Sequence, residues 1–447
     1  MMELARYDAY KDSGVKWVSE TPFQWEITRN KEIFEERGNL SNSGAETLLT
    51  VSHITGVTRR SEKNVNMFMA ETMEGYKLCK KGDLIINTMW AWMGALGTTN
   101  ENGICSPAYG VYKPRKHQPY NHHYFDYLYR TPNSITEMTR NSKGIVSSRL
   151  RLYPKDFFQI KTALPNYETQ KAIADYLDTK TNQIDQKIGL LTQKKTQYSK
   201  LKESLINETV TRGLDKTVAM KDSGVEWIGE VPVHWEVKRL KELGFLYSGL
   251  SGKKGDDFTD EHKFSSNFIP FVNIANNQYI STTDMKKVIV YPNEKQNKAK
   301  KNDLFFLMSS ENHEDIGKSA LLKVDIVNTY LNSFCKGFRF TRKDIVANFI
   351  NYLLASVKCR NSVSVEGKGF TRINLKIEKI NDLLLIVPPL PEQQAIADYL
   401  DTKTAHIDRI IETINTQITK LQELRKTLIN DVVTGKIKVV MKGEADE

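Results

Sequence analysis

Hydrophobic residues are spaced most regularly in two long segments of the chain, residues 166–213 and 389–435. In both segments an apolar side chain recurs every seven residues, and further apolar residues follow some of these positions by four. Such spacing places one apolar stripe along an α-helix and is typical of a coiled coil. The stripe positions are Leu177, Ile184, Ile188, Leu191, Tyr198 and Leu205 in the first segment, and Leu400, Ile407, Ile411, Ile414, Ile418, Leu421 and Leu428 in the second.

Both predicted helices begin after prolines and end at a glycine, Gly213 or Gly435, which suits the left-handed cap of a helix C-terminus. Roughly 40 helical residues at a rise of about 1.5 Å form a rod of about 60 Å. A lone rod would expose its stripe, so we expect the two rods to pair as an antiparallel coiled coil. Core packing of each stripe inside its own globular half is the alternative. The first stripe is weaker, because Lys195 and Lys202 occupy two of its positions.

The segments outside the rods show short apolar runs, such as Asp83–Asn87 and Asp303–Leu307, separated by glycine, asparagine and proline. Runs of this length between turn residues indicate β-strands. We therefore predict two globular blocks of mixed α/β (α+β) type, joined by the two long helices.

The chain also contains an internal repeat. Residues 11–27 share ten identities with residues 221–237, and residues 172–181 recur unchanged at 395–404, which is 223 positions later. The intervening blocks diverge but keep a faint common frame. In this frame residues 80–90 align with residues 300–310, and residues 48–54 align with residues 269–275. Constant connections around divergent blocks suggest two readers on one pseudo-two-fold frame, although a duplication without functional meaning is the alternative.

Composition adds a possible partner and a compartment. The 447 residues include 64 Lys and Arg against 54 Asp and Glu, a net charge of +10 that favours a polyanion such as nucleic acid. The sequence contains no run of 18 apolar residues, so no membrane span is predicted. The amino-terminal segment lacks the apolar core of a signal peptide. The cysteines are scattered without a C-x-x-C pair, which argues against disulfides or zinc and favours a reducing cytoplasm. They are Cys79, Cys105, Cys335 and Cys359.

Polar side chains of the two blocks are candidates for DNA contacts, because Arg, Lys, Asn and Ser fix phosphates and read base edges. Each of them, taken alone, is also an ordinary surface residue. Trp90 and Trp92 lie in an apolar run, which predicts core positions rather than a stacking platform. The candidates are Arg59, Arg60, Lys63, Lys143, Arg149 and Arg151 in the first block, and Lys253, Lys254, Asn273, Asn276, Ser310, Asn312, His313, Lys318, Lys368 and Arg372 in the second.

Catalytic motifs are missing from the sequence. It has no G-x-x-x-x-G-K-[ST] phosphate loop. Its only Pro-Pro pair, Pro388–Pro389, lacks the amide and aromatic neighbours with which adenine methyltransferases hold a flipped base. That pair stands where prolines commonly start a helix. The histidines show no ligand spacing, and we expect His122 and His123 in a loop. We therefore expect no catalytic residue, metal or cofactor on this chain.

The duplicated layout resembles the specificity (S) subunit of type I restriction–modification systems. The resemblance is carried by the paired segments KDSGVKWVSETPFQW and KDSGVEWIGEVPVHW, and by LPNYETQKAIADYLDTKT and LPPLPEQQAIADYLDTKT, which open the two helices. It spans about residues 11–435. The copies depart from each other where the helices begin, because Glu168 and Glu392 hold different offsets from AIADYLDTKT.

The resemblance implies two target recognition domains that read the halves of a bipartite DNA sequence, spaced by the coiled coil. The implied divisions are a conserved segment 1–27, a recognition domain 28–165, a helix 166–213, a linker with the repeated segment 214–237, a recognition domain 238–388, a helix 389–435 and a tail 436–447.

The same resemblance implies double-stranded DNA and two modification (methyltransferase) subunits as partners, and two restriction (motor/nuclease) subunits where such subunits exist. S-adenosylmethionine, ATP and Mg are then expected on the partner subunits, and the chain itself is expected to be non-catalytic, cytoplasmic and associated with the nucleoid. A coiled-coil scaffold with two protein-binding domains is the alternative from another functional class. The missing catalytic motifs disfavour a third reading, the tail of a self-contained restriction–methylation enzyme.

Overall fold

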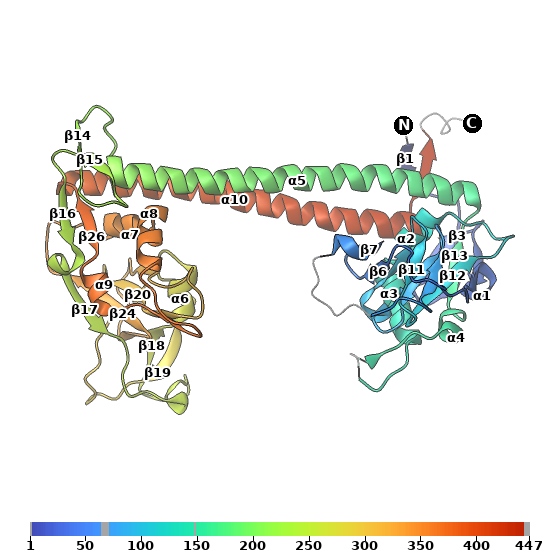
Figure 1. Cartoon of the computed structure of the whole chain (residues 1–447), viewed down its shortest axis with the longest axis horizontal. Helices are drawn as coiled ribbons and strands as arrows, with labels where there is room; N and C mark the ends of the chain where they lie inside the picture. The colour runs from blue at the N-terminus through green and yellow to red at the C-terminus, as the bar shows by residue number, and fades with distance from the viewer. Residues whose placement is uncertain (1, 64–70, 147–148, 442–447) are drawn as a thin grey trace. The chain divides into compact units, whose positions relative to one another are not determined.

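The computed structural model describes residues 2–63, 71–146 and 149–441. It divides the chain into two compact units. Unit 1 comprises Met1–Thr192 and Thr416–Glu447, and unit 2 comprises Gln193–Asn415. Each unit contains a globular domain and one part of each long helix, α5 (Tyr167–Arg212) and α10 (Leu390–Val433) (Figure 1). The predicted fold class is confirmed: two mixed α/β domains are joined by two long, paired helices.

The domain of unit 1 is built on a four-stranded antiparallel sheet with the strand order β10-β9-β12-β5. Its strands are β5 (Phe34–Glu36), β9 (Leu84–Asn87), β10 (Leu96–Thr98) and β12 (Tyr109–Pro114). Three helices follow β12 along the chain, namely α2 (His122–Tyr129), α3 (Pro132–Asn141) and α4 (Pro154–Phe157). Thr131 caps α3 by accepting a hydrogen bond from the backbone N–H of Ser134, and Pro132 suits the first helical position.

In the described part of unit 1, five antiparallel strand pairs accompany this sheet. They are β1 (Met2–Ala5) with β27 (Lys438–Met441), β2 (Tyr10–Val15) with β3 (Val18–Pro22), β4 (Glu26–Arg29) with β13 (Lys161–Leu164), β6 (Leu49–Ser52) with β7 (Gly56–Arg59), and β8 (Lys77–Cys79) with β11 (Gly103–Cys105). Short helical turns lie at α1 (Asn30–Ile33), η1 (Arg60–Glu62) and η2 (Ala91–Met93).

Unit 2 repeats this frame with the sheet order β22-β20-β24-β17. The strands are β17 (Gly244–Ser248), β20 (Leu304–Leu307), β22 (Ser319–Leu321) and β24 (Cys335–Phe340), and the helices that follow are α7 (Ala347–Ala355), α8 (Val357–Ser364) and α9 (Ile377–Asn381). Strand β16 (Glu236–Arg239) pairs with β26 (Leu384–Val387), as β4 does with β13 in unit 1.

Two further features of unit 2 repeat unit 1. The pair β14 (Met220–Asp222) with β15 (Glu230–Pro232) keeps the register of β2 with β3, and the turn η4 (Leu240–Glu242) begins 210 residues after α1. The elements that distinguish unit 2 are the sheet β19 (Lys286–Ile289), β18 (Ser265–Ile269) and β23 (Thr329–Leu331), the pair β21 (Ser309–Ser310) with β25 (Ile373–Asn374), helix α6 (Phe271–Asn276) and the turn η5 (Gly255–Asp257). The faint sequence frame is therefore wrong in one place: residues 48–54 contain strand β6, whereas residues 269–275 contain the end of strand β18 and, after Pro270, the start of helix α6.

The two predicted strands near residues 84 and 304 are confirmed as β9 and β20, and the same turn leads into both. This turn needs a left-handed residue, which is Gly82 at φ 91° in unit 1 and Asn302 at φ 69° in unit 2. Asparagine and glycine are the residues that adopt this conformation most readily. The turn therefore explains why KKGD and KKND survive in otherwise divergent blocks.

The aspartate of each turn is buried and paired with an arginine of the same sheet. Asp83 and Asp303 are each 1% exposed. Arg37 Nε lies 2.6 Å from Asp83 Oδ2, and Arg339 Nη2 lies 2.7 Å from Asp303 Oδ2. Each hydrogen-bonded carboxylate raises the pKa of its arginine. A buried charge is tolerated because its partner and its hydrogen bonds replace water.

The hydrophobic core of each domain includes parts of both long helices. In unit 1, Leu177 near the start of α5 and Val432 near the end of α10 belong to the same buried cluster as Trp25. In unit 2, Ile206 near the end of α5 and Leu400 near the start of α10 belong to the cluster that contains Trp235. Leu177 and Leu400, predicted as stripe residues, thus lie in the domain cores as well.

Each helix ends as predicted, at a left-handed glycine. Gly213 has φ 75° and Gly435 has φ 78°. A Cβ atom at Gly213 would lie 3.1 Å from the ring of Trp235, and one at Gly435 would lie 3.0 Å from the ring of Trp25. Glycine is therefore required for both conformation and close approach, which ties each repeated tryptophan segment to a helix end.

The two helices run antiparallel within each unit and carry matched ion pairs. Arg425 Nε lies 3.2 Å from Asp185 Oδ1 in unit 1, and Lys202 Nζ lies 2.7 Å from Asp408 Oδ1 in unit 2. The two cations are 223 residues apart, and so are the two aspartates, which is the spacing of the internal repeat. All the predicted stripe residues are buried or half-buried. The polar stripe position Lys202 is thus a cross-helix contact.

Two further expectations change in the structure. His122 and His123 begin helix α2 rather than lying in a loop. Cys79 and Cys105, scattered in the sequence, are buried free thiols whose sulfur atoms lie 3.4 Å apart, because β8 pairs with β11. None of the helices in the described part of the chain combines the length and apolar character needed to cross a membrane.

Candidate nucleic-acid interface

A buried glutamine anchors the start of each long helix to its domain. The side chain of Gln393 has no exposed surface. Its amide nitrogen donates to the carbonyls of Asp344 at 3.0 Å and Pro388 at 2.8 Å, and its oxygen accepts the backbone N–H of Val346 at 2.8 Å. One side chain therefore provides the hydrogen-bond partner of three backbone groups near the start of this helix.

Gln170 makes the corresponding contacts in unit 1, also with no exposed surface. It donates to the carbonyls of Pro119 at 3.0 Å and Pro165 at 2.9 Å, and accepts the backbone N–H of Asn121 at 2.8 Å. The two glutamines are 223 residues apart. Glu168 and Glu392 have different offsets from the segment AIADYLDTKT, whereas Gln170 and Gln393 occupy the same place in both copies.

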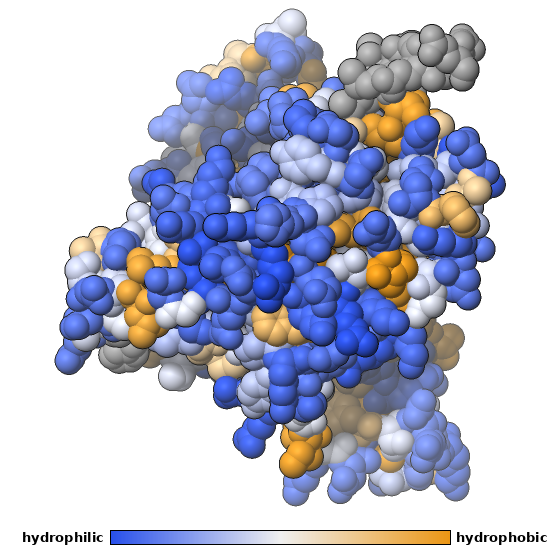
Figure 2. Space-filling view, turned by 90° about the vertical axis from the view of Figure 1, so that its right-hand side faces the viewer, coloured by the Kyte–Doolittle hydropathy of each residue, from blue (hydrophilic) through white to orange (hydrophobic). Residues whose placement is uncertain are grey.

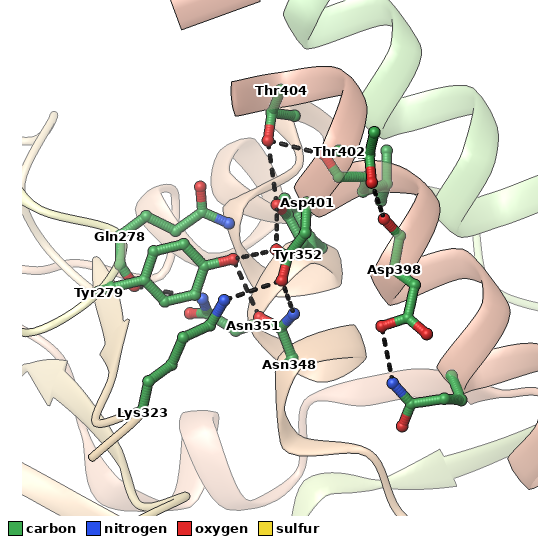
Figure 3. A network of polar contacts seen from close by, with 12 residues as sticks. Gln278, Tyr279, Lys323, Asn348, Asn351, Tyr352, Asp398, Asp401, Thr402 and Thr404 are labelled. Carbon is green, nitrogen blue, oxygen red and sulfur yellow. Dashed lines mark hydrogen bonds and ion pairs between the residues drawn. The ribbon is translucent and has the colours of Figure 1, made fainter. Parts of the chain in front are cut away.

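An aspartate on the same helix binds several side chains of its domain, as Figure 3 shows for unit 2. Asp401 accepts hydrogen bonds from the hydroxyls of Tyr352 at 2.7 Å and Tyr279 at 2.9 Å, and from Asn348 at 3.1 Å. The ammonium of Lys323 lies 2.9 Å from the carboxylate and 3.9 Å from the ring centroid of Tyr279. Burial alone would raise the pKa of Asp401, but the hydrogen bonds from Lys323 and Tyr352 outweigh it and lower that pKa.

Unit 1 has a smaller version of this network. The hydroxyl of Tyr127 donates to Asp178 at 2.8 Å and lies 3.1 Å from the hydroxyl of Thr181, while His123 Nδ1 lies 3.3 Å from Asp178. Asp178 and Asp401 occupy the same position of the unchanged segment AIADYLDTKT. The identity of that segment therefore has a structural cause, because its polar residues dock the domain while its apolar residues enter the core.

The structure brings several sequence-predicted DNA candidates of unit 2 together on two adjoining loops. The first, which we call the central-strand loop, is Ser309–Gly317 after β20. The second, which we call the lysine–glycine loop, is Lys368–Asn374. Strand β21 at the start of the first loop pairs with β25 at the end of the second, and the backbone N–H of Leu375 donates to Met308 at 2.9 Å. Asn312 and His313 thus share one surface region with Lys368 and Arg372.

Unit 1 has the same pair of loops. Its central-strand loop is residues 88–94, and its lysine–glycine loop is residues 143–151. The backbone N–H of Leu152 donates to Thr88 at 3.0 Å, which corresponds to the contact between Leu375 and Met308 in unit 2. Residues 147–148 of the second loop lie outside the described residues. The structure therefore places the candidates Lys143, Arg149 and Arg151 beside the loop that contains Trp90.

Trp90 corrects a sequence-based expectation. It was predicted to be a core residue but is 48% exposed, whereas Trp92 is half-buried and donates its indole N–H to the carbonyl of Met89 at 3.0 Å. The turn η2 ends at Gly94, whose left-handed conformation (φ 87°) leads the chain into β10. This turn interrupts the apolar run, so its first tryptophan points to the surface rather than continuing a strand.

The other candidates of unit 1 lie on the β6–β7 hairpin and the turn after it. Arg59 binds Glu101 through both carboxylate oxygens at 2.7–2.9 Å, which raises the pKa of the guanidinium. Lys63 Nζ donates to Thr55 at 2.6 Å, and Arg60 is half-exposed. These cations are accessible, but Arg59 is partly neutralised.

Three candidates of unit 2 are occupied by internal contacts. The Lys253 side chain is 7% exposed and lies 2.6 Å from Glu294. Asn273 is 1% exposed and hydrogen-bonds the backbone of Ser281 in both directions, at 2.8 and 2.9 Å. Ser310 is 4% exposed. These side chains stabilise loops, which single-sequence reasoning could not distinguish from surface contacts.

The remaining candidates of unit 2 are accessible. Lys254, Asn276, Asn312, His313, Lys368 and Arg372 are exposed. Lys318 is half-buried and lies 2.6 Å from Asp315. Burial would raise the pKa of Asp315, but hydrogen bonds from Lys318 and Asn312 lower it. The aspartate is therefore charged near neutral pH and orders the central-strand loop.

A half-buried arginine that the sequence does not single out also supports this loop. Arg360 on α8 donates from Nη2 to the carbonyls of Glu314 at 3.1 Å and Ile316 at 2.8 Å. Burial lowers the pKa of this guanidinium. Its position in a polar stretch of the sequence gave no signal of this role.

The described surface is largely polar. On the face drawn in Figure 2, hydrophobic residues form small groups separated by hydrophilic ones. Within the described ranges, no three His, Cys, Asp or Glu side chains are grouped as a metal site. What the described surface offers is charged and amide side chains on ordered loops, which suits phosphates and base edges.

Comparisons with known proteins agree with this arrangement. The family model for the type I restriction modification DNA specificity domain matches the chain twice, at residues 22–196 and 232–420. The chain is 27% identical over 293 residues to the specificity subunit of the type I restriction enzyme MjaVIII of Methanocaldococcus jannaschii, with 64% of each protein covered. It is 26% identical over 212 residues to the EcoKI specificity subunit of Escherichia coli, covering 47% of this chain and 44% of that one.

Those matches span less than two thirds of the lengths of these two relatives. Solved structures are similar over longer stretches. A chain from a structure on complex assembly and conformational transition of a type I R-M system has a TM-score of 0.69 at 13% identity, covering 92% of this chain and 98% of that one. The HsdS subunit of Thermoanaerobacter tengcongensis has a TM-score of 0.55 at 15% identity, covering 93% and 98%. At these identities the likeness establishes the fold.

Proposed function

This chain belongs to the type I restriction–modification DNA specificity family, and we propose that it reads the DNA target of such a complex. Each domain reads one half of a split sequence. The observation that carries the proposal is the pairing of central-strand and lysine–glycine loops at the same place of two repeated frames. These loops present accessible Lys and Arg side chains in both units, and accessible Asn312 and His313 in unit 2. The frames agree while the loop sequences differ, so the two half-sites are expected to differ as well.

The chemistry is assigned to partner subunits. The chain docks two modification subunits, which methylate adenine with S-adenosylmethionine, and through them restriction subunits that use ATP and Mg where such subunits exist. Family membership and the missing catalytic motifs of the sequence support this division. A DNA target implies that the chain is located in the cytoplasm beside the nucleoid. Its free cysteines suit a reducing compartment.

A methylation assay tests the proposal. The chain is purified alone, with its modification subunits, and as those subunits without the chain, and each preparation receives S-adenosylmethionine and genomic DNA. Only the complex should methylate DNA, at a single split sequence that methylome sequencing reads directly. Methyl transfer by the chain alone would contradict the division of labour. Footprints of the complex without any protected split sequence would favour a coiled-coil scaffold with two protein-binding domains.

A further inference from the structure

The lysine–glycine loops have the same order of features in both domains, although the surrounding sequences diverge. Each has a lysine, then a glycine, then a large apolar residue, and further on an arginine. The residues are Lys143, Gly144, Ile145 and Arg149 in unit 1, and Lys368, Gly369, Phe370 and Arg372 in unit 2. Both loops follow the second of two consecutive helices, α3 or α8. The loops are therefore equivalent parts of the repeated frame.

The two loops are also closed in the same way. Lys143 and Arg151 exchange two backbone hydrogen bonds of 2.9 Å, and Lys368 and Asn374 exchange two of 3.0 and 2.8 Å. Two backbone bonds at the base of a short loop limit the conformations that its tip can adopt.

The glycine of each loop packs against the carbonyl of the loop arginine. A Cβ atom at Gly144 would lie 2.7 Å from the oxygen of Arg149, and one at Gly369 would overlap the oxygen of Arg372. Gly369 also has φ 141°, a conformation that other residues rarely adopt. In unit 2 this packing fixes the conformation that holds Phe370, the next residue, at the tip of the loop.

The apolar residue that follows each glycine is fully exposed. Phe370 and Ile145 have relative exposures of 107% and 104%. An exposed aromatic ring at a rigid tip gains free energy when a partner covers it, by about 25 cal/mol per Å² of apolar surface. The neighbours of Phe370 indicate the partner, because Lys368 and Arg372 are exposed beside it. Cations around an apolar tip are complementary to phosphates around stacked bases.

We propose that Phe370 is a wedge residue that enters the base stack of the half-site read by unit 2 in duplex DNA. The proposal rests on the DNA-reading function proposed above and adds how the target is deformed. Lys368 and Arg372 neutralise the phosphates beside this wedge. The guanidinium of Arg372 already lies 4.7 Å from the ring centroid of Phe334, which restricts its orientation. Apolar side chains inserted between bases unstack a step and kink the duplex, which favours removal of a base from the stack by a methyltransferase.

The test uses the assembled complex of this chain with its modification subunits. Its probe is a duplex that carries the target found by methylome sequencing, with 2-aminopurine placed in turn at each position of the half-site read by unit 2. Wild-type complex should raise the 2-aminopurine fluorescence at one step, because an unstacked base is less quenched. Phe370→Ala should abolish this rise and weaken target binding roughly tenfold, as loss of one base–aromatic contact does.

Matched variants separate insertion from general effects. Phe370→Trp keeps a large ring and should retain the fluorescence rise. Val327→Ala removes another exposed apolar side chain of unit 2, which is 82% exposed but lies outside the loop, and should behave as wild type. Binding to a duplex of random sequence should be the same for all variants, because phosphate contacts dominate it.

Two outcomes separate this inference from the proposed function. If wild-type complex prefers the target duplex and Phe370→Ala gives the same affinity and the same fluorescence, the wedge is overturned and the DNA-reading function stands. If wild-type complex does not distinguish the target duplex from the random one, the DNA-reading function fails and the wedge fails with it.

Discussion

Replacement of Gln393 by alanine should detach the start of α10 from the domain of unit 2. The side chain is fully buried and makes three hydrogen bonds of 2.8–3.0 Å, two to carbonyls and one from a backbone N–H. Alanine leaves these three backbone groups without their partner. A buried unsatisfied group costs about 1–3 kcal/mol, so three of them give about 3 kcal/mol at the lower end, with water entering the cavity.

The neighbouring residue provides a matched control. Gln394 is exposed and makes one hydrogen bond of 2.8 Å to Asp398, four positions along the helix. Gln394→Ala should cost only about 0.2–0.5 kcal/mol, the value of such a pair on a helix surface. The two substitutions change the same residue type at adjacent positions. They therefore differ in burial and partners far more than in helix propensity.

Hydrogen exchange read by mass spectrometry during urea titration is the suitable assay, because it reports each unit separately when unfolding is not two-state. Peptides from α7 and from the start of α10 should lose protection at lower urea in Gln393→Ala, while the domain of unit 1 keeps its midpoint. Gln170→Ala should give the reverse pattern. Equal, small effects of Gln393→Ala and Gln394→Ala would refute the assignment of the glutamine as the anchor.

Three further predictions follow from the frame. The folded-state pKa of Asp401 lies below the ordinary value of about 3.9, so its stabilising contribution is present above that value and is lost as pH falls through the folded pKa. Urea titrations of unit 2 should therefore show a weaker acid dependence in Asp401→Asn, and identical dependences would contradict the network. Gly82→Ala should destabilise unit 1 by about 1 kcal/mol or more, because Gly82 has φ 91°. Gly82→Asn should destabilise it by less, because Asn302 holds the equivalent place in unit 2. A lower thermal midpoint for Gly82→Asn than for Gly82→Ala would argue against the shared turn. Insertion of one heptad into both 184–205 and 407–428 should change the gap in the methylated target and leave the half-sequences unchanged, whereas an unchanged gap would exclude the helices as the ruler.

The sequence by itself determined the features that depend on local chemistry. Seven-residue apolar spacing predicts both long helices, since the side chains on one face of a helix follow from its period. The glycines at 213 and 435 mark the helix ends because few other residues adopt a left-handed cap. The strands after Lys81 and Lys301 were predicted from short apolar runs flanked by turn residues. Duplication doubled each of these signals, and the unchanged segment AIADYLDTKT identified the frame.

Only the tertiary structure decided which polar residues belong together. Asn312 and Lys368 are 56 residues apart in the chain and share one surface region because β21 pairs with β25. Lys253 and Asn273 have the residue types of DNA contacts, yet internal partners occupy them. Trp90 is exposed although its neighbours are apolar. The physical reason is common to all these cases: exposure and polar partners are set by contacts between distant segments, and the local pattern of a single sequence contains no record of them.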